Sequence, residues 1–180
     1  LKNPLFDARY TSGDGWEVRN VTTGGKGTMA YGEGYAGTAS AKLVKTAAAG
    51  EEGICQDVTL GAGTYTFSAY LKTEGLSGAD RKGAGVMILH TDGSRSEGAE
   101  RITGETEAKV DQGWERLAVT FTLAKSEKVT VFAGIFGTTG TLYVSGAQLE
   151  SGKAANKLNL IMNPGFESVT SGNPDYWTYS

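Results

Sequence analysis

The stretch TYTFSAYLKT, residues 64–73, alternates strictly between apolar and polar side chains. Successive side chains of a β-strand point to opposite faces, so this pattern predicts a strand with one buried and one solvent-facing side. The buried side is expected to carry Tyr65, Phe67, Ala69 and Leu71, and the other side Thr66, Ser68, Tyr70 and Lys72.

The rest of the chain gives further strands. Residues 114–123 alternate in the same way, and residues 54–60 form another strand. Residues 129–133 and 141–144 are predicted to form a hairpin, because the turn-rich GTTG at 137–140 lies between them. Residues 86–90 are almost continuously apolar, as expected for a central strand that is covered on both sides or lines a cleft.

Helical patterning is weak throughout. Residues 38–49 are rich in Ala, but no apolar stripe recurs at the helical period, and we interpret them as a strand that leads into a loop. The chain has 27 Gly, only three Pro and 39% apolar residues, enough for one core with tight turns. These features predict an all-β domain, an antiparallel two-sheet β-sandwich.

One motif occurs twice. Asn-Pro-Gly-Phe-Glu at 163–167 repeats Asn-Pro-Leu-Phe-Asp at 3–7, and a Trp follows each copy, Trp177 and Trp16. A repeat at such long spacing is typical of tandem modules. We therefore expect one module at residues 1–152, and at 153–180 a linker with the first strand of a following repeat.

Composition and charge argue against several classes of function. The net charge is -3 and the 17 Lys and Arg are scattered, which argues against nucleic-acid binding. No apolar run approaches the ~18 residues of a membrane-spanning helix, so no membrane insertion is expected, and an export signal would lie outside this sequence. Cys55 is the single cysteine, and we expect a buried, unreactive thiol.

Catalysis is not expected. Nucleophile-elbow, zinc-protease and phosphate-loop motifs are absent from the sequence. The acidic residues gather in polar loops, at residues 51–52 and 97–107, and not in a pattern that indicates two carboxylates across a cleft. We assign no catalytic residue.

Several segments occur in an order typical of one family: NPLFD at 3–7, YAGTASAKL at 35–43, AGTYTFSAYLKT at 62–73, GWERLAVTFTL at 113–123 and TLYVSGAQLESG at 141–152. Together they resemble carbohydrate-binding modules of the family 4, 9 and 22 type. The resemblance implies a jelly-roll sandwich, a structural calcium ion, and a glycan-binding cleft on the concave sheet or at the loop tips. It also implies an extracellular, secreted or wall-attached protein, with polysaccharide or cell-surface glycan and neighbouring modules as partners.

The resemblance assigns two calcium ligands, the Asp7 carboxylate and the Lys42 backbone carbonyl. The family's Asp in the last strand is replaced here by Ser145, followed by Gly146, so one anionic ligand is missing. Asp7 could instead cap a turn.

Sugars stack on aromatic rings while polar groups bind their hydroxyls. Tyr70 and Lys72 offer both on one strand face, and His90 could join them or be an ordinary surface histidine. Tyr31 and Tyr35 could form a binding loop edge or cover the rim of the core. Gln56 matches a polar position of the family, yet alternation places it on the buried face unless the strand carries a bulge.

Trp16 and Trp114 are expected to close the ends of the core. Two functions remain open. The first is a non-catalytic carbohydrate-binding module with an open concave face and an exposed aromatic such as Tyr70. The second is a structural spacer of a surface stalk, whose concave face is filled by Phe132, Phe136 or loop side chains.

Overall fold

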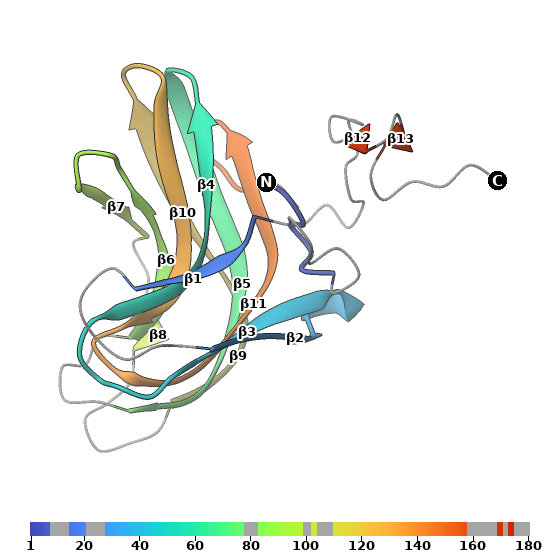
Figure 1. The fold of residues 1–180 in the computed structure, drawn as a ribbon, viewed down its shortest axis with the longest axis vertical. Coiled ribbons are helices and arrows are strands. Elements are labelled where there is room, and N and C mark those ends of the chain that lie inside the picture. Colours follow the sequence, from blue (N-terminus) through green and yellow to red (C-terminus); the bar gives the residue numbers. More distant parts are fainter. Residues whose placement is uncertain are drawn as a thin grey trace.

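The protein is an antiparallel β-sandwich, seen here in a computed structural model that describes residues 1–7, 15–20, 28–77, 83–98, 102–103, 110–157, 169–170 and 173–174. No α-helix occurs in this part of the chain. The two sheets face each other (Figure 1), as the alternating strands predict.

Sheet A contains six strands and sheet B five. Sheet A has the order β1-β4-β10-β6-β7, with β8 also paired to β6: β1 Glu17–Asn20, β4 Glu51–Leu60, β10 Glu127–Phe136, β6 Gly83–Leu89, β7 Arg95–Glu97, β8 Ile102–Thr103. Sheet B has the order β2-β3-β11-β5-β9: β2 Thr28–Glu33, β3 Ala39–Lys45, β11 Thr139–Ser151, β5 Gly63–Ser77, β9 Val110–Leu123. The 3-10 turn η2, Tyr35–Gly37, joins β2 to β3, and the short β12, Val169–Thr170, pairs with β13, Asn173–Pro174.

The long strands alternate between the sheets along the chain. Strands β3, β5, β9 and β11 belong to sheet B, and β4, β6 and β10 belong to sheet A. This is the jelly-roll arrangement, and it shows that the predicted hairpin is wrong. Strands β10 and β11 lie in different sheets, because the chain crosses the sandwich edge at Gly137, which has a φ of +60°.

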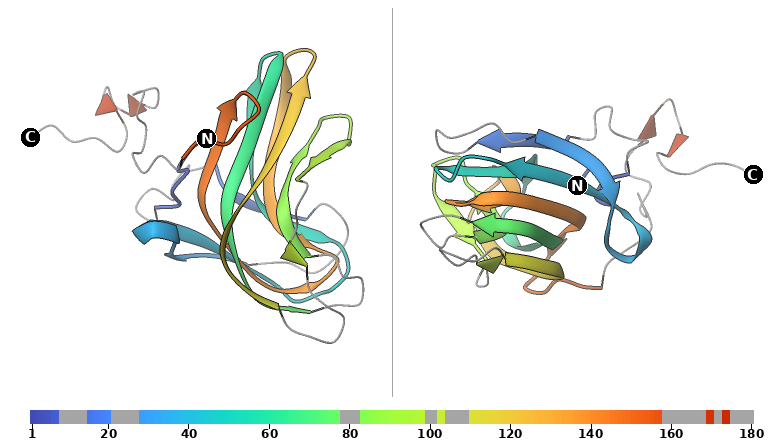
Figure 2. Two further views of the ribbon diagram at one scale, coloured as in Figure 1. Left: turned by 180° about the vertical axis from the view of Figure 1, so that it is seen from behind. Right: turned by 90° about the horizontal axis from the view of Figure 1, so that it is seen from below.

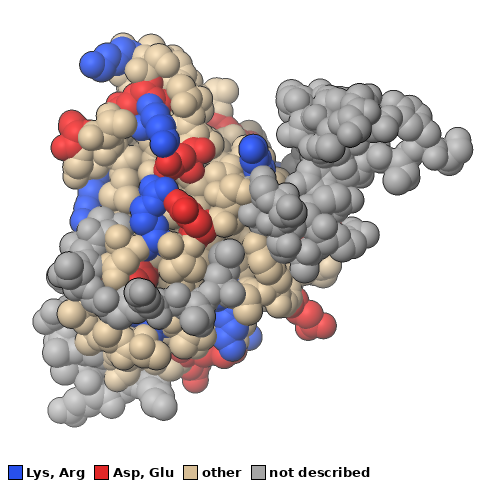
Figure 3. Space-filling model, viewed as in Figure 1, with Lys and Arg blue, Asp and Glu red and all other residues tan. Residues whose placement is uncertain are grey.

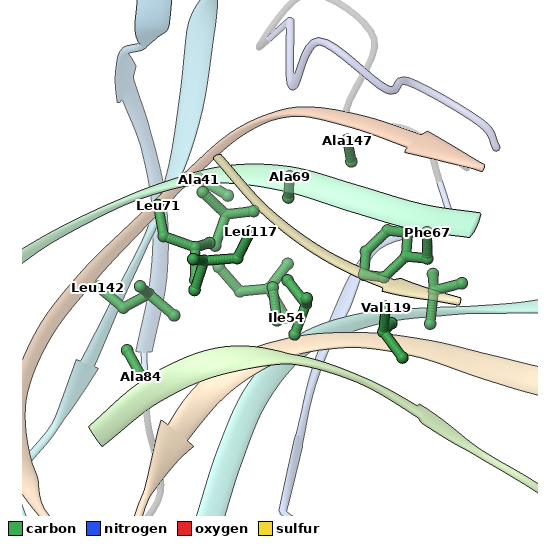
Figure 4. Packing of buried hydrophobic residues seen from close by; sticks show 14 of the residues in the cluster. Ala41, Ile54, Phe67, Ala69, Leu71, Ala84, Leu117, Val119, Leu142 and Ala147 are labelled. Atoms are coloured by element: carbon green, nitrogen blue, oxygen red, sulfur yellow. The ribbon is translucent and has the colours of Figure 1, made fainter. Parts of the chain in front are cut away.

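Figure 2 shows the two sheets from two further directions. The core lies between them and consists of the inward side chains of both (Figure 4). Phe67, Ala69 and Leu71 of β5 are completely buried, as predicted, but Thr66 and Ser68 of the other side are buried as well, so the prediction that this side faces solvent is wrong for these two residues. Val119 of β9 packs in the same cluster. Strand β6 is buried on both faces, as predicted, and residues 38–49 form a strand followed by a loop.

The N-terminal turn, residues 3–7, closes one end of the core. The Asp7 amide donates to Asn3 Oδ1 over 2.8 Å, and the Trp16 indole donates to the Asn3 carbonyl over 3.0 Å. Phe6 is fully buried against the Trp16 ring, with centroids 4.7 Å apart. The Pro4 carbonyl accepts from the Ala147 amide of β11. The prediction that Trp16 closes the core is therefore confirmed.

Both sheets bend along their strands, and sheet A lies on the inner side of the bend (Figure 1). Each sheet has one face that is turned away from the core, called here its outer face. The outer face of sheet A lies on the inside of the bend, and the outer face of sheet B lies on the outside of the bend. The domain boundary predicted after residue 152 is not tested, since most of residues 158–180 lie outside the described residues.

Candidate functional site

Tyr70 projects from the outer face of sheet B, but it is not an open stacking surface. Tyr35 of η2 lies parallel to it, with ring centroids 3.7 Å apart and an interplanar angle of 9°. The Arg116 guanidinium lies 5.6 Å from the same ring. Burial, together with the neighbouring Tyr35, raises the pKa of the Tyr70 hydroxyl. The prediction of an exposed aromatic such as Tyr70 on the concave sheet is therefore wrong, because Tyr70 belongs to sheet B and Tyr35 covers its ring.

Tyr143 is another partly exposed aromatic of this face. It lies on β11 between Leu142 and Val144, which are completely buried, so its ring points outward. In the register of the sheet, Tyr143 is flanked by Lys42 of β3 and Lys72 of β5. The ammonium groups lie 5.4 Å and 4.8 Å from its ring centroid.

Glu74 connects Tyr143 to Lys72 in a row of side chains that also includes Lys42. Its Oε2 accepts a hydrogen bond from the Tyr143 hydroxyl over 2.9 Å, and its Oε1 pairs with Lys72 Nζ over 2.9 Å. The hydrogen bonds from Lys72 and Tyr143 lower the pKa of Glu74, and the bond to Glu74 raises the pKa of Lys72. The predicted sugar contact Lys72 therefore lies in an ordered group of polar side chains beside an aromatic ring.

Trp114 extends the row on β9. It is partly exposed, lies outside the core and meets the Tyr143 ring edge-on at 6.5 Å. The expectation that Trp114 closes the core is wrong, because Trp114 alternates with the core residues Leu117 and Val119 and lies on the same outer face of sheet B as Arg116. A shallow pocket of about 470 Å³ opens where the register of β5 and β9 shifts after Leu71, and it is lined by Lys72, Thr73, Glu74, Asp111, Gln112 and Gly113.

Two other predicted sugar contacts, Tyr31 and Gln56, contribute to the fold and not to this row of side chains. Tyr31 packs against the core from β2, so it covers the rim. Gln56 is 4% exposed, and its amide binds the backbone of Lys2 with both ends, at 2.8 and 3.1 Å. Strand β4 pairs with β10 without a bulge, so alternation keeps Gln56 on the inner side, away from Tyr70 and Lys72.

His90 lies at the end of β6 in sheet A. Its Nδ1 is 3.3 Å from Glu127 Oε1, its Nε2 is 3.0 Å from Ser96 Oγ, and its ring meets Phe121 edge-on. It does not join Tyr70 and Lys72, because those residues lie on the other sheet. The structure favours the alternative of a histidine with satisfied partners.

The inner face of the bend carries a second apolar cluster on sheet A. Cys55, Met87, Phe132 and Phe136 form it, all completely buried. Burial raises the pKa of the Cys55 thiol to about 12, which keeps it protonated at neutral pH. The expectation of an inert cysteine is confirmed in this respect.

A charged network lies beside this cluster, across β1, β4 and β10. Asp57 accepts hydrogen bonds from Arg19 over 3.0 Å and from Thr130 over 2.7 Å, and it pairs with Lys128 over 2.8 Å. Arg19 also pairs with Glu17. Figure 3 shows basic and acidic side chains interspersed on the face that it draws, without a field of one sign.

The groups assigned to calcium do not form an oxygen shell. Backbone groups of Asp7 are bound by the Asn3 side chain, and Lys42 is paired with strands on both sides. Ser145 Oγ accepts from the Tyr35 amide over 3.1 Å and donates to the Ala39 carbonyl over 2.8 Å. In the described part of the chain, no cluster of three or more His, Cys, Asp or Glu could hold a metal ion. The contacts with Asn3 involve the backbone of Asp7 and not its carboxylate, so the calcium site stays a prediction.

Sequence reasoning missed Tyr143 and the outward position of Trp114. Tyr143 alternates with Leu142 and Val144, which was a usable sign that its ring faces outward. Its neighbours Lys42 and Lys72 come from strands far apart in the sequence, so only the strand register brings them together.

No protein-family profile matches the sequence, and no curated protein matches it. Solved structures do match. A CBM22-1–CBM22-2 tandem domain of Xyn10C from Paenibacillus barcinonensis has a TM-score of 0.58 at 15% identity, with 87% of this chain and 47% of that chain covered. A xylan-binding domain of CBM family 22 gives 0.55 at 16% identity, covering 82% and 91%.

A third match is the family 61 module TmCBM61, solved with β-1,4-galactotriose, with a TM-score of 0.52 at 15% identity, covering 84% of this chain and 97% of that one. The chain thus has the fold of carbohydrate-binding modules, as the sequence resemblance predicted. Within the described residues, no helix is long and apolar enough to cross a membrane.

Proposed function

We propose that the chain is a non-catalytic carbohydrate-binding module that binds polysaccharide on the outer face of sheet B. The observation that carries the proposal is the row of Trp114 and Tyr143 beside Lys42, Lys72 and Glu74. Aromatic rings that are partly exposed supply stacking surfaces, and the charged groups around them can bind hydroxyls. The fold shared with modules that bind xylan and galactotriose supports the same class of ligand.

The proposal excludes glycoside hydrolysis at this face. A hydrolase needs one carboxylic acid with a raised pKa to protonate the leaving group. Glu74 is instead held ionised by Lys72 and Tyr143, and Asp111 accepts a hydrogen bond from the Gly75 amide. Both carboxylates beside the pocket therefore act as fixed acceptors.

The wider setting is also proposed. An extracellular protein with several modules in tandem agrees with the repeated motif at residues 163–167 and with the family's binding of polysaccharide. Weak single sites gain avidity when modules are repeated, which suits a polysaccharide with many identical units. Tyr70 and Tyr35 serve here as the support that positions Arg116 beside the site.

Affinity electrophoresis in gels containing xylan, galactan or other soluble polysaccharides tests the proposal. Tyr143→Ala is expected to weaken retardation by about tenfold or more in Kd, a loss of about 1.4 kcal/mol. Tyr143→Phe is the matched control, since it keeps the ring and loses only the hydroxyl bond to Glu74. Binding that is equal in wild type, Tyr143→Ala and Trp114→Ala would exclude this face.

The second candidate is a spacer module without a sugar site. It is favoured by the complete burial of Phe132 and Phe136, which fill the inner face of the bend. Lack of retardation by every polysaccharide, with an unchanged melting temperature in Tyr143→Ala, would support the spacer.

A further inference from the structure

The outer face of sheet B carries three cations and three carboxylates around the aromatic row, and the whole chain has a net charge of -3. Three cations face the row from β3, β5 and β9: Lys42, Lys72 and Arg116. Among the carboxylates, Glu74 pairs with Lys72, Asp111 binds the Gly75 amide, and Glu150 of β11 binds Asn156. Among the described residues, Lys72 is therefore the one cation of this face that forms an ion pair, while Lys42 and Arg116 contact neutral groups.

Lys42 is partly exposed and is the first of these two cations. Its ammonium lies 5.4 Å from the Tyr143 ring, and no carboxylate of the described chain lies within ion-pairing distance of it. Its nearest anionic influence is Glu74, which already binds Lys72 and the Tyr143 hydroxyl. The Lys42 ammonium can therefore pair with a carboxylate of a ligand without breaking an existing ion pair.

Arg116 is the second cation that contacts only neutral groups directly. Its guanidinium donates to the Ser68 hydroxyl over 2.9 Å, to the Gln148 side-chain carbonyl over 2.8 Å and to the Asn156 backbone carbonyl, all of which are neutral. Its Nε is buried without a hydrogen-bond partner in the described structure. These contacts fix the position of Arg116 but leave its charge to act on the surface beside it.

The cations and the aromatic rings lie in two rows across sheet B, one with Arg116 and Tyr70 and the other with Lys42, Tyr143 and Lys72. Tyr70, whose ring lies under Arg116, is two residues from Lys72 on β5, so the two rows are about 7 Å apart along the strands. Lys42 and Lys72 flank Tyr143 within one row. A sugar ring against Trp114 and Tyr143 would therefore lie among cations on two sides.

From this arrangement we infer that the face binds an acidic polysaccharide, in which the carboxylate of a uronic acid unit pairs with Lys42 while the sugar ring lies against Trp114 and Tyr143. The inference rests on the proposed function and specifies its ligand class. The carboxylate supplies the anion that Lys42 lacks, and the field of Arg116 and Lys72 adds to the attraction.

Polygalacturonate and its methyl ester form a matched pair of probes, because they share the sugar and differ in charge. The acid is expected to bind about threefold to fivefold tighter than the ester at low salt, with the difference falling at high salt. Lys42→Gln should remove the preference, so that the acid and the ester bind equally tightly. Lys125→Gln, at an exposed lysine outside the face, should keep the preference.

The outcomes separate the inference from the proposed function. Equal binding of acid and ester, or a preference that survives Lys42→Gln, overturns the inference and leaves the proposed function standing. Failure to bind either probe or any neutral polysaccharide overturns both. Polyglutamate, a polyanion without sugar rings, completes the test: binding as tight as that of polygalacturonate would mean that charge alone is recognised, which also overturns the inference.

Discussion

Phe132 lies flat over two glycines of neighbouring strands. Gly53 of β4 pairs with Gly134 of β10, and a Cβ added at Gly53 would come within 2.3 Å of the Phe132 ring. A ring buried on the surface of a sheet needs such space, because any larger residue would occupy the same volume. The two glycines thus explain why a Phe can be completely buried on the outer side of sheet A.

Gly53→Ala is therefore expected to destabilise the protein by about 1–3 kcal/mol, since the ring must leave its position. Urea unfolding measures the effect. Gly32→Ala is the control: Gly32 lies on exposed β2 with no atom within 4 Å of an added Cβ, and it should change stability by less than about 0.5 kcal/mol. Equal effects of the two substitutions would show that Phe132 does not occupy this site.

At the level of elements, a single carboxylate connects three strands of sheet A. Burial by itself raises the pKa of Asp57, but hydrogen bonds from Arg19, Lys128 and Thr130 outweigh it and hold the pKa well below its usual range. The folded state therefore binds this proton less readily than the unfolded state. The stabilisation is present above the unfolded pKa of 3.8 and is lost as the pH falls below it.

Asp57→Asn should cost about 1.5–3 kcal/mol at neutral pH, in the range of hydrogen bonds to charged groups, and much less in acid. Urea midpoints measured from neutral to acid pH check this, with a variant curve flatter than that of wild type. Glu17→Gln is the control, because Glu17 contacts the same Arg19 but is 57% exposed. Parallel curves for wild type and Asp57→Asn would contradict the assignment.

The strands themselves could be predicted from the sequence, but their partners could not. Phe67, Leu71 and Val119 face the core as their alternation requires. The same alternation does not say which sheet a strand enters, so β10 and β11 were predicted to pair although they face each other across the sandwich.

The candidate site was predicted only in part for the same reason. Lys72 was correctly placed beside an aromatic residue, but that residue is Tyr143 of the neighbouring strand and not Tyr70. The outward side of Trp114 was readable from its alternation with Arg116, but its place beside Tyr143 depends on the order of the strands, which local sequence does not encode.

For the whole molecule, the N-terminal turn and the last long strand close the sandwich without a metal. The Pro4 carbonyl binds the Ala147 amide directly, and Ser145 is engaged by Tyr35 and Ala39. Excess EDTA is therefore expected to leave the melting temperature unchanged, because a bound ion would otherwise add stability by mass action. A fall of several degrees that calcium restores would support Asp7 and Lys42 as ligands.

The central claim is that polysaccharide binds on the outer face of sheet B. A heteronuclear NMR titration with a soluble polysaccharide tests it most directly, since the Trp114 indole and the amides of Tyr143, Lys42 and Lys72 report on that face. The account predicts that these signals shift together, while those of Arg19 and of the rest of sheet A stay in place. Shifts concentrated at Arg19, Asp57 and Phe132 would contradict it, because the ligand would then occupy the opposite sheet.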